Sequence, residues 1–297
     1  MPRLRIRAFA RSGLLALALT LGWAMPARAA RPLMPHRGMV WLITVRSLDR
    51  LRSVPGSRGV VRLFFSGGPN SILVGGPRSR FPDLAASHSQ AYGSYRSLRL
   101  GLAATRGPRL VVLDLENWAA TPRREQISPA AYYARAARYA RRHGFILVAT
   151  PSSNLVPPWS GPLLPSFTSY LVSGLVGQVA KSADIFEVQA QGFERSTNLY
   201  AAFVAAAAAQ AREANPRVSV IAGLSTNPGG RGVPAAQLYR DAVAVRPYVD
   251  GFWLNIPARS WTCRSCGVAR PDIGAQLLER LSHHRAFWPG APARSAP

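Results

Sequence analysis

Apolar runs rich in β-branched residues recur at a nearly constant interval through the second part of this chain. Five of them begin near Leu110, Phe145, Ile185, Val218 and Gly251, so that successive runs start 33 to 40 residues apart. This interval is typical of a strand followed by a crossover helix, which joins parallel strands. The recurrence therefore predicts an α/β fold built on a parallel sheet.

The stretches between these runs have the composition and spacing of helices. The segment 129–143 ends before Gly144, a suitable residue after a helix C-terminus, and the alanine-rich segment 198–213 follows Thr197 as a candidate cap. Two more helices are expected at 235–245 and 272–284. A helix is thus predicted after most of the later strands.

Three earlier apolar runs complete the set, at 39–44, 60–66 and the short 71–74. Eight strand–helix units in about 250 residues predict a single-domain (β/α)₈ TIM-type barrel. An open doubly wound sheet is the alternative, but no glycine-rich phosphate loop follows the first run. The run at 71–74 is the weakest of the eight, and the count falls to seven if it is only a hairpin arm.

The N-terminus reads as a secretory signal peptide rather than as part of the fold. Four arginines in the first twelve residues precede the apolar stretch 14–24, and Ala27-Arg28-Ala29 fits a cleavage site. The apolar stretch is shorter than the roughly 20 residues of a spanning helix. We therefore expect cleavage after residue 29, a barrel domain over 30–297, no membrane span after signal removal, and a secreted or cell-envelope location.

The charge balance is strongly basic, with 37 basic and 13 acidic residues and a net charge of +24. Such an excess suggests a polyanionic partner. Lys181 is the only lysine, however, and exclusion of lysine favours a bias in coding composition over selection for phosphate contact. The arginine-rich surface is expected at most to adhere to an anionic envelope polymer, and no specific nucleic-acid partner is predicted.

Two of the scarce acids, Asp114 and Glu116, stand two residues apart at the end of the run that begins at Leu110. Side chains at i and i+2 of a strand share a face and lie roughly 7 Å apart. Adjacent charges at the end of a buried strand are costly unless they are used or paired. An acid/base pair is one interpretation, and a structural salt bridge from Asp114 to an arginine is the other.

Polar and aromatic side chains also follow other predicted strands, where the active sites of this architecture lie. Flat rings beside amides and carboxylates suit a sugar ligand, although packing in the core is the ordinary role of a tryptophan. The candidate substrate-binding residues are Asn117, Trp118, Trp159, Gln189, Gln191, Trp253 and Asn255. A carbohydrate polymer is the predicted partner.

The Asp-x-Glu at the end of the fourth strand resembles glycoside hydrolase family 18, which includes chitinases, and is similar to that of family 25, the lysozyme-type muramidases. The resemblance implies that Glu116 is the general acid and that Asp114 orients the N-acetyl group of the substrate, whose oxygen acts as nucleophile. It also implies that Trp253 floors the site. The chain departs from family 18 on strand 6, where Gln189 and Gln191 stand in place of a tyrosine and an aspartate.

The two cysteines, Cys263 and Cys266, lie in the loop after the eighth strand. In an exported protein this spacing favours a disulfide, while a zinc site with His283 and His284 and a redox role are alternatives. No histidine lies at a predicted strand end, so neither a metal site nor a Ser-His-Asp triad is expected, and no cofactor is predicted.

Three functions are compatible with these patterns. The first is a secreted glycosidase that acts on a β-linked, N-acetylated glycan through Glu116. The second is a non-catalytic carbohydrate-binding barrel of the cell envelope, in which glutamines replace catalytic carboxylates. The third is an envelope protein whose basic surface binds an anionic polymer.

Overall fold

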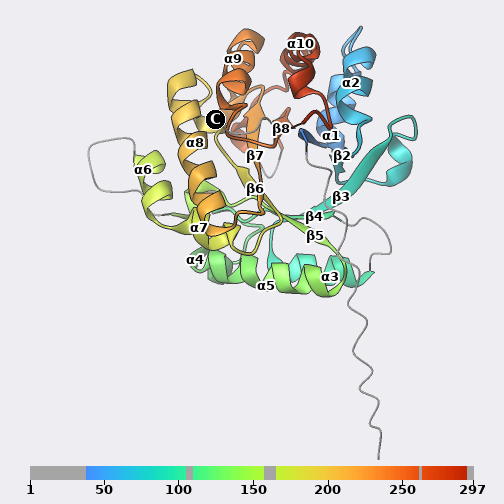
Figure 1. The fold of residues 1–297 in the computed structure, drawn as a ribbon. Coiled ribbons are helices and arrows are strands. Elements are labelled where there is room, and N and C mark those ends of the chain that lie inside the picture. Colours follow the sequence, from blue (N-terminus) through green and yellow to red (C-terminus); the bar gives the residue numbers. More distant parts are fainter. Residues whose placement is uncertain (1–37, 105–109, 157–164, 261–262, 293–297) are drawn as a thin grey trace, which may run out of the picture. The chain divides into compact units, whose positions relative to one another are not determined.

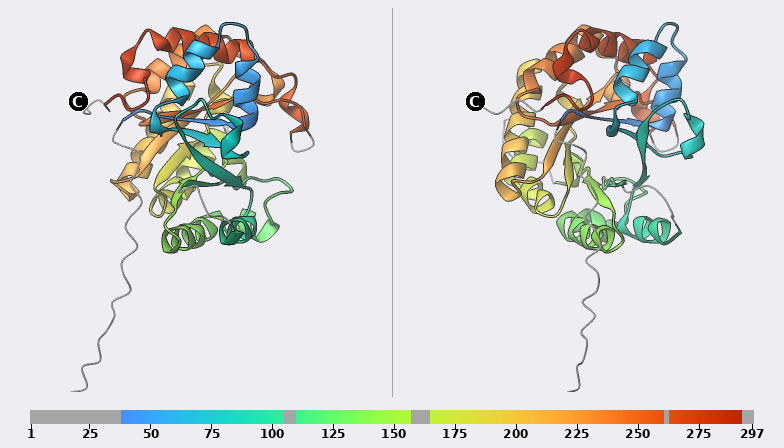
Figure 2. Two further views of the ribbon diagram at one scale, coloured as in Figure 1. Left: turned by 90° about the vertical axis from the view of Figure 1, so that its right-hand side faces the viewer. Right: turned by 45° about the vertical axis from the view of Figure 1, so that its right-hand side comes forward.

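The computed structural model describes residues 38–104, 110–156, 165–260 and 263–292. Eight parallel strands follow one another in chain order and close into a barrel, with β8 paired to β1 (Figures 1 and 2). The strands are β1 (Val40–Thr44), β2 (Gly68–Val74), β3 (Ala86–Tyr92), β4 (Leu110–Leu113), β5 (Ile146–Ala149), β6 (Ile185–Val188), β7 (Ser219–Ser225) and β8 (Gly251–Asn255). The predicted (β/α)₈ barrel is confirmed.

Helices surround the closed sheet in the views of Figure 2. They are α1 (Val45–Arg52), α2 (Arg58–Phe65), α3 (Tyr95–Ala104), α4 (Arg123–Ile127), α5 (Pro129–Arg142), α6 (Pro165–Val172), α7 (Leu175–Ala180), α8 (Thr197–Ala214), α9 (Ala235–Val245) and α10 (Pro271–Ser282). The four predicted helices are confirmed within two residues at each end. The cap of α8 is Ser196 rather than Thr197, since the Ser196 hydroxyl accepts a hydrogen bond from the Leu199 N–H.

The predicted strand at 60–66 is wrong, because this segment belongs to α2. Its buried residues, Val60, Val61, Phe64 and Phe65, recur with the spacing of one helix face. The structure instead has β3, which the sequence pattern missed because its residues are mostly polar or small. The run at 71–74 is part of β2, so the two errors cancel and the numbering of the later strands is unaffected.

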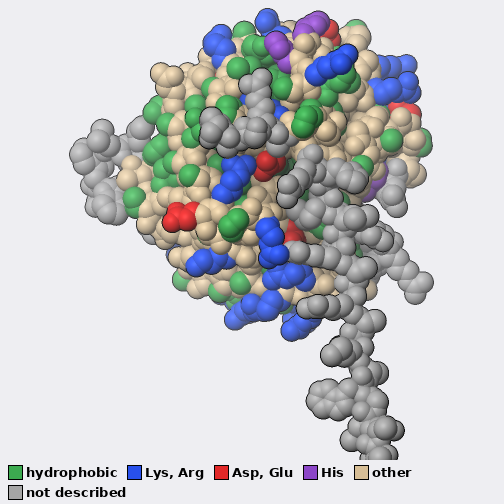
Figure 3. All heavy atoms as spheres, in the orientation of Figure 1, with side chains coloured by type: hydrophobic (Ala, Val, Ile, Leu, Met, Phe, Trp, Pro, Cys, Tyr) green, Lys and Arg blue, Asp and Glu red, His purple; other side chains and the backbone are tan. Residues whose placement is uncertain are grey.

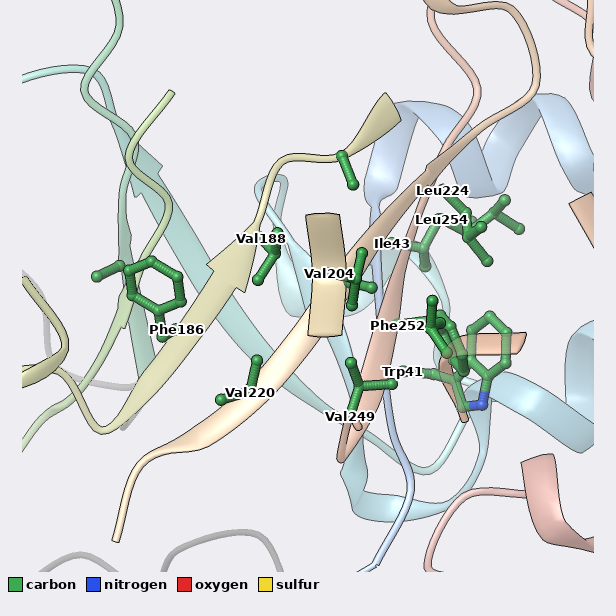
Figure 4. Packing of buried hydrophobic residues seen from close by; sticks show 14 of the residues in the cluster. Trp41, Ile43, Phe186, Val188, Val204, Val220, Leu224, Val249, Phe252 and Leu254 are labelled. Carbon is green, nitrogen blue, oxygen red and sulfur yellow. The ribbon is translucent and has the colours of Figure 1, made fainter. Parts of the chain in front are cut away.

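Alternation along the strands divides the apolar residues into two layers. Val112, Val148 and Ile221 belong to a cluster inside the barrel. The residues of opposite orientation belong to the larger cluster between the strands and helices, part of which Figure 4 shows around Trp41 and Phe252. Burial on both faces explains why these strands read as nearly continuous apolar runs.

Residues 1–37 lie outside the described part of the chain, so the signal peptide and the domain boundary at residues 29 and 30 stay predictions. Among the helices that are described, none has both the length and the apolar character needed to cross a membrane.

Candidate functional site

The end of β4 delivers the carboxylate pair to the mouth of the barrel. Leu110 and Val112 face the barrel interior, and the period of the strand continues this face through Asp114 and Glu116. Both acidic side chains are partly buried. The Asp114 N–H donates to the Tyr92 carbonyl (2.9 Å), which extends the pairing with β3 past the last residue of β4.

Two neutral donors hold the Asp114 carboxyl group. The Thr150 hydroxyl donates to Asp114 Oδ1 (2.9 Å), and the Gln189 amide nitrogen lies 3.2 Å from the same oxygen. The same amide also donates to the Thr150 carbonyl (3.0 Å). The ends of β4, β5 and β6 are thus joined through one carboxyl group.

The electrostatics of the pair favour the protonated forms. Burial, followed by repulsion from Glu116, raises the pKa of Asp114 to about 7, against hydrogen bonds from Thr150 and Gln189. Burial also raises the pKa of Glu116, opposed by hydrogen bonds from Asn154 and Gln189. Burial therefore disfavours negative charge on both carboxyl groups.

A third acid, Glu187 on β6, lies deeper in the barrel. Its side chain is 2% exposed, and its Oε1 atom has no hydrogen-bond partner among the described residues. Burial raises the pKa of Glu187 well above its usual value, with further contributions from Asp114 and Glu116. Its proximity to the pair means that the three groups cannot all carry charge together at low cost.

Glycine at position 223 makes room for this arrangement. A Cβ atom there would lie 2.2 Å from Gln191 Nε2 and 2.8 Å from Glu187 Oε1. Gln191 and Glu187 therefore meet over the one residue of β7 that has no side chain. Gln191 therefore lies close to Glu187. Its role in substrate binding stays a prediction.

No arginine neutralises the cluster within the described ranges. The salt bridges there are Arg52–Asp83, Arg80–Asp49, Arg212–Asp250, Arg270–Asp272 and His283–Glu279. The structural alternative for Asp114, a salt bridge to an arginine, therefore finds no support there.

Trp118 and Asn117 lie in the loop after β4, with their polar groups already engaged. The Trp118 indole N–H donates to Thr121 Oγ1 (2.8 Å), and the Asn117 backbone N–H donates to Asn154 Oδ1 (2.8 Å). Thr121 also accepts from the Glu116 N–H (3.2 Å). The loop is thus fixed by its own hydrogen bonds, and the Asn117 side chain is exposed.

Trp253 belongs to the cluster inside the barrel and is 6% exposed, with no hydrogen-bond partner for its indole N–H among the described residues. Asn255, two residues further along β8, is half-buried. Neither residue makes a described contact with Asp114 or Glu116. Trp159 falls in the segment 157–164, outside the described residues.

The predicted disulfide between Cys263 and Cys266 is confirmed, with the Cα atoms 5.4 Å apart. Because both thiols are used in this bond, they do not bind zinc in the described structure. A redox role stays a prediction, since a redox-active pair forms the same bond when oxidised. Among the residues that the structure describes, no group of three or more His, Cys, Asp or Glu side chains is arranged to hold a metal ion.

The residues that sequence reasoning missed are the neutral partners, Thr150 and Asn154, and the spacer Gly223. Thr150 directly follows β5, so its position at a strand end was the signal that could have identified it. Nothing in the sequence signals Gly223, because its role depends on side chains from the neighbouring strand.

Four cavities lined by described residues lie among the outer helices, not at the mouth. They occur beside α2, between α3 and α5, between α5 and α7, and between α7 and α8. Residues 157–164, after β5, and 261–262, after β8, are not described. None of these four cavities is lined by Asp114 or Glu116.

No protein-family model matches this chain, and no curated protein matches it. Solved structures are similar to it at 7 to 13% identity. With a sugar phosphate isomerase/epimerase from Parabacteroides distasonis, 10% identical, the TM-score is 0.44, covering 89% of this chain and 100% of the other. With a protein provisionally described as an α-L-fucosidase from Bacteroides thetaiotaomicron, 7% identical, the TM-score is 0.45, covering 95% and 99%.

The carboxyl transferase domain of pyruvate carboxylase from Rhizobium etli is 11% identical, with a TM-score of 0.44 over 87% of this chain. This chain spans about half the length of that protein, 49%. These likenesses carry no argument about the reaction of this chain, and the barrel itself is defined by the order of its strands.

Proposed function

We propose that this protein is a glycoside hydrolase in which Glu116 is the general acid and Asp114 is the orienting carboxyl group. The observation that carries the proposal is an acidic pair at the carboxyl end of β4, without a cationic partner in the described ranges and with raised pKa values. Active sites of barrel enzymes lie at this end. Cleavage of a glycosidic bond needs a carboxylic acid that is still protonated near neutral pH.

The resemblance to family 18 makes the substrate a β-linked, N-acetylated glycan. Glu116 would donate its proton to the leaving glycosidic oxygen while the bond to the anomeric carbon breaks. The acetamido oxygen of the substrate would bond to that carbon, with Asp114 accepting a hydrogen bond from the acetamido N–H. The Glu116 carboxylate would then take a proton from the water that opens the cyclic intermediate and restore the starting state.

A non-catalytic carbohydrate-binding barrel is the second candidate, and Gln189 and Gln191 favour it. Gln189 donates to Asp114 Oδ1, and Gln191 lies beside Glu187. Neutral amides cannot provide the negative field that carboxylates give a developing positive charge. Such a barrel would bind the glycan without releasing reducing ends.

The test is reducing-end release from a β-1,4-linked N-acetylglucosamine polymer by the wild type and by Glu116→Gln. The proposal expects hydrolysis that the variant loses while glycan binding remains. Glu279→Gln is the matched control, since Glu279 is an exposed residue of the outer helix α10. Hydrolysis that continues in Glu116→Gln would remove the assignment, and binding without hydrolysis by the wild type would favour the second candidate.

Export also remains part of the proposal, because residues 1–29 are not described. Fusing these residues to a reporter enzyme that is active only outside the cytoplasm should yield signal and a processed N-terminus. A reporter retained at full length inside the cell would contradict a secreted or cell-envelope location.

A further inference from the structure

Helices α3 and α5 pack side by side on the outside of the barrel (Figure 1). Residues of these two helices and of α4 line a groove. The groove has a cavity volume of about 530 Å³. Its lining combines four arginines with three tyrosines. They are Arg96, Arg99, Arg124, Arg135, Tyr95, Tyr132 and Tyr139. Figure 3 shows basic side chains gathered over this part of the molecule.

The arginines of the groove are exposed, and within the described ranges none of them forms a salt bridge. Other arginines of the chain, such as the half-buried Arg52 and the exposed Arg80, are paired with aspartates. Guanidinium groups close together without counter-charges repel one another, so an anion in the groove would relieve a cost. A guanidinium also presents paired donors that match a carboxylate or phosphate group.

Tyrosine rings hold two of the guanidinium groups in place. Arg135 Cζ lies 4.8 Å from the centroid of the Tyr132 ring, and Arg99 Cζ lies 5.9 Å from that of Tyr139. Cation–π contact of this kind restricts the arginine, so less conformational entropy is lost when it binds an anion. The rings also offer apolar faces on which a sugar can lie.

The one acid that lines the groove is buried beneath it. Glu125 is fully buried, and its Oε2 atom accepts a hydrogen bond from the Tyr95 N–H (2.7 Å), which ties α4 to the start of α3. A single buried carboxylate faces four guanidinium groups. The groove therefore keeps an excess of positive charge at its surface.

The loop that carries the acidic pair is hydrogen-bonded to the elements beside the groove. Gln126 of α4 donates to the Trp118 carbonyl (3.0 Å), and Thr121 of the same loop donates to the Gly93 carbonyl (2.7 Å) just before α3. Thr121 also holds the backbone of Glu116. A chain-like ligand lying in the groove would thus emerge beside the barrel mouth.

We propose that the groove between α3 and α5 binds a segment of an anionic polysaccharide, one bearing carboxylate or phosphate groups, whose continuation reaches the mouth of the barrel. Arginine forks would bind the anionic groups, and tyrosine rings would contact the sugar faces. This inference rests on the proposed function only for the fate of the chain at the mouth. Binding in the groove itself does not require hydrolysis.

The test measures binding of carboxymethyl dextran and of dextran phosphate to the full chain carrying Glu116→Gln, with neutral dextran as reference. Arg99→Gln combined with Arg135→Gln should weaken binding of the preferred anionic polymer about tenfold or more and reduce its salt dependence. Arg217→Gln combined with Arg280→Gln removes the same charge from exposed arginines outside the groove, and should change binding less than about twofold. The polymer bound more tightly identifies the anionic group.

Tyr132→Leu removes a ring that contacts the sugar and holds Arg135, and it leaves the charge of the groove unchanged. It should weaken polysaccharide binding about threefold or more while leaving the salt dependence unchanged. Equal losses in the groove and control arginine pairs would overturn the proposal. So would single-stranded DNA of matched charge binding as tightly as the polysaccharide, because the groove would then not select sugars. Groove binding with no hydrolysis by the wild type would leave this inference standing and count against the glycosidase alone.

Discussion

Two pairs of acidic residues in this barrel have raised pKa values, but the two pairs differ in how far they are buried. At the mouth, Asp114 and Glu116 are partly exposed and are held only by neutral side chains. Beneath the end of β7, Glu194 and Asp241 are fully buried, and burial raises both pKa values, that of Asp241 to about 6.

The second pair supports the fold. Glu194 Oε1 accepts a hydrogen bond from the Ser225 N–H (2.6 Å), and Asp241 Oδ1 accepts from Thr197 and Gln237. These contacts tie the end of β7 and α9 to the segment that begins α8. The comparison teaches that a perturbed pKa identifies an unusual environment, and that accessibility then separates a reactive acid from a structural one.

The largest difference between the two pairs is expected when one acid of each pair is replaced by a neutral amide. Glu116→Gln should lower glycan hydrolysis about 10²- to 10⁴-fold, the contribution of a general acid, and leave the melting temperature nearly unchanged. Glu194→Gln keeps an acceptor for Ser225 and should preserve hydrolysis. Steady-state rates beside thermal unfolding curves of both variants check this, and equal rate losses would contradict the distinction.

The pH dependence of the unfolding free energy tests whether the pKa of Asp114 is raised in the folded chain. Because the pKa of Asp114 is higher in the folded chain than in the unfolded chain, the wild type loses stability as pH rises from about 4 through about 7. Asp114→Asn removes this loss. Relative to the wild type, the variant should gain about 2 to 4 kcal/mol in unfolding free energy between pH 4 and pH 8. Denaturant titrations at several pH values measure this difference. If the unfolding free energies of the wild type and Asp114→Asn change in parallel with pH, the raised pKa is contradicted.

Removing the Glu194 carboxyl group should lower the unfolding free energy and leave the rate of hydrolysis unchanged. Glu194→Ala leaves the buried Ser225 N–H without its acceptor and opens a cavity, for an expected loss of about 2 to 3 kcal/mol. The rate per folded molecule should stay near that of the wild type. Denaturant unfolding with an activity assay well below the melting temperature measures both, and a large rate loss in a stable variant would count against a structural role.

The smallest effect is expected from adding a methyl group at Gly223, next to Glu187. Gly223→Ala places a methyl group against Gln191 and Glu187, which must move, at an expected cost of about 1 to 3 kcal/mol. Gly59→Ala is the matched control, since no atom lies within 4 Å of its added Cβ in α2. It should be neutral or slightly stabilising. Equal effects of the two changes would show that Gly223 has no packing role.

The sequence was sufficient to predict the barrel because strands buried on both faces are continuously apolar, as at β4 and β5. It failed at β3, whose polar residues resemble a loop, and at α2, whose β-branched and aromatic residues resemble a strand. Local composition misled in both places, because tertiary packing determined the structure.

The candidate site was predictable where it depends on strand period. Asp114, Glu116 and Gln189 were identified by their positions at strand ends, and the structure brings them together. The bond from Thr150 to Asp114 and the space above Gly223 arise between neighbouring strands, whose pairing a single sequence does not contain.

The most direct test of the acidic pair is a ¹³C NMR titration of the side-chain carboxyl carbons in the wild type, Asp114→Asn and Glu116→Gln. The resonance missing from Asp114→Asn should titrate with an apparent pKa of about 7 in the wild type. It should titrate at lower pH in Glu116→Gln, where the neighbouring charge is removed. An Asp114 resonance that titrates near 4, or one that does not respond to the loss of Glu116, would contradict the coupled pair on which the proposed chemistry depends.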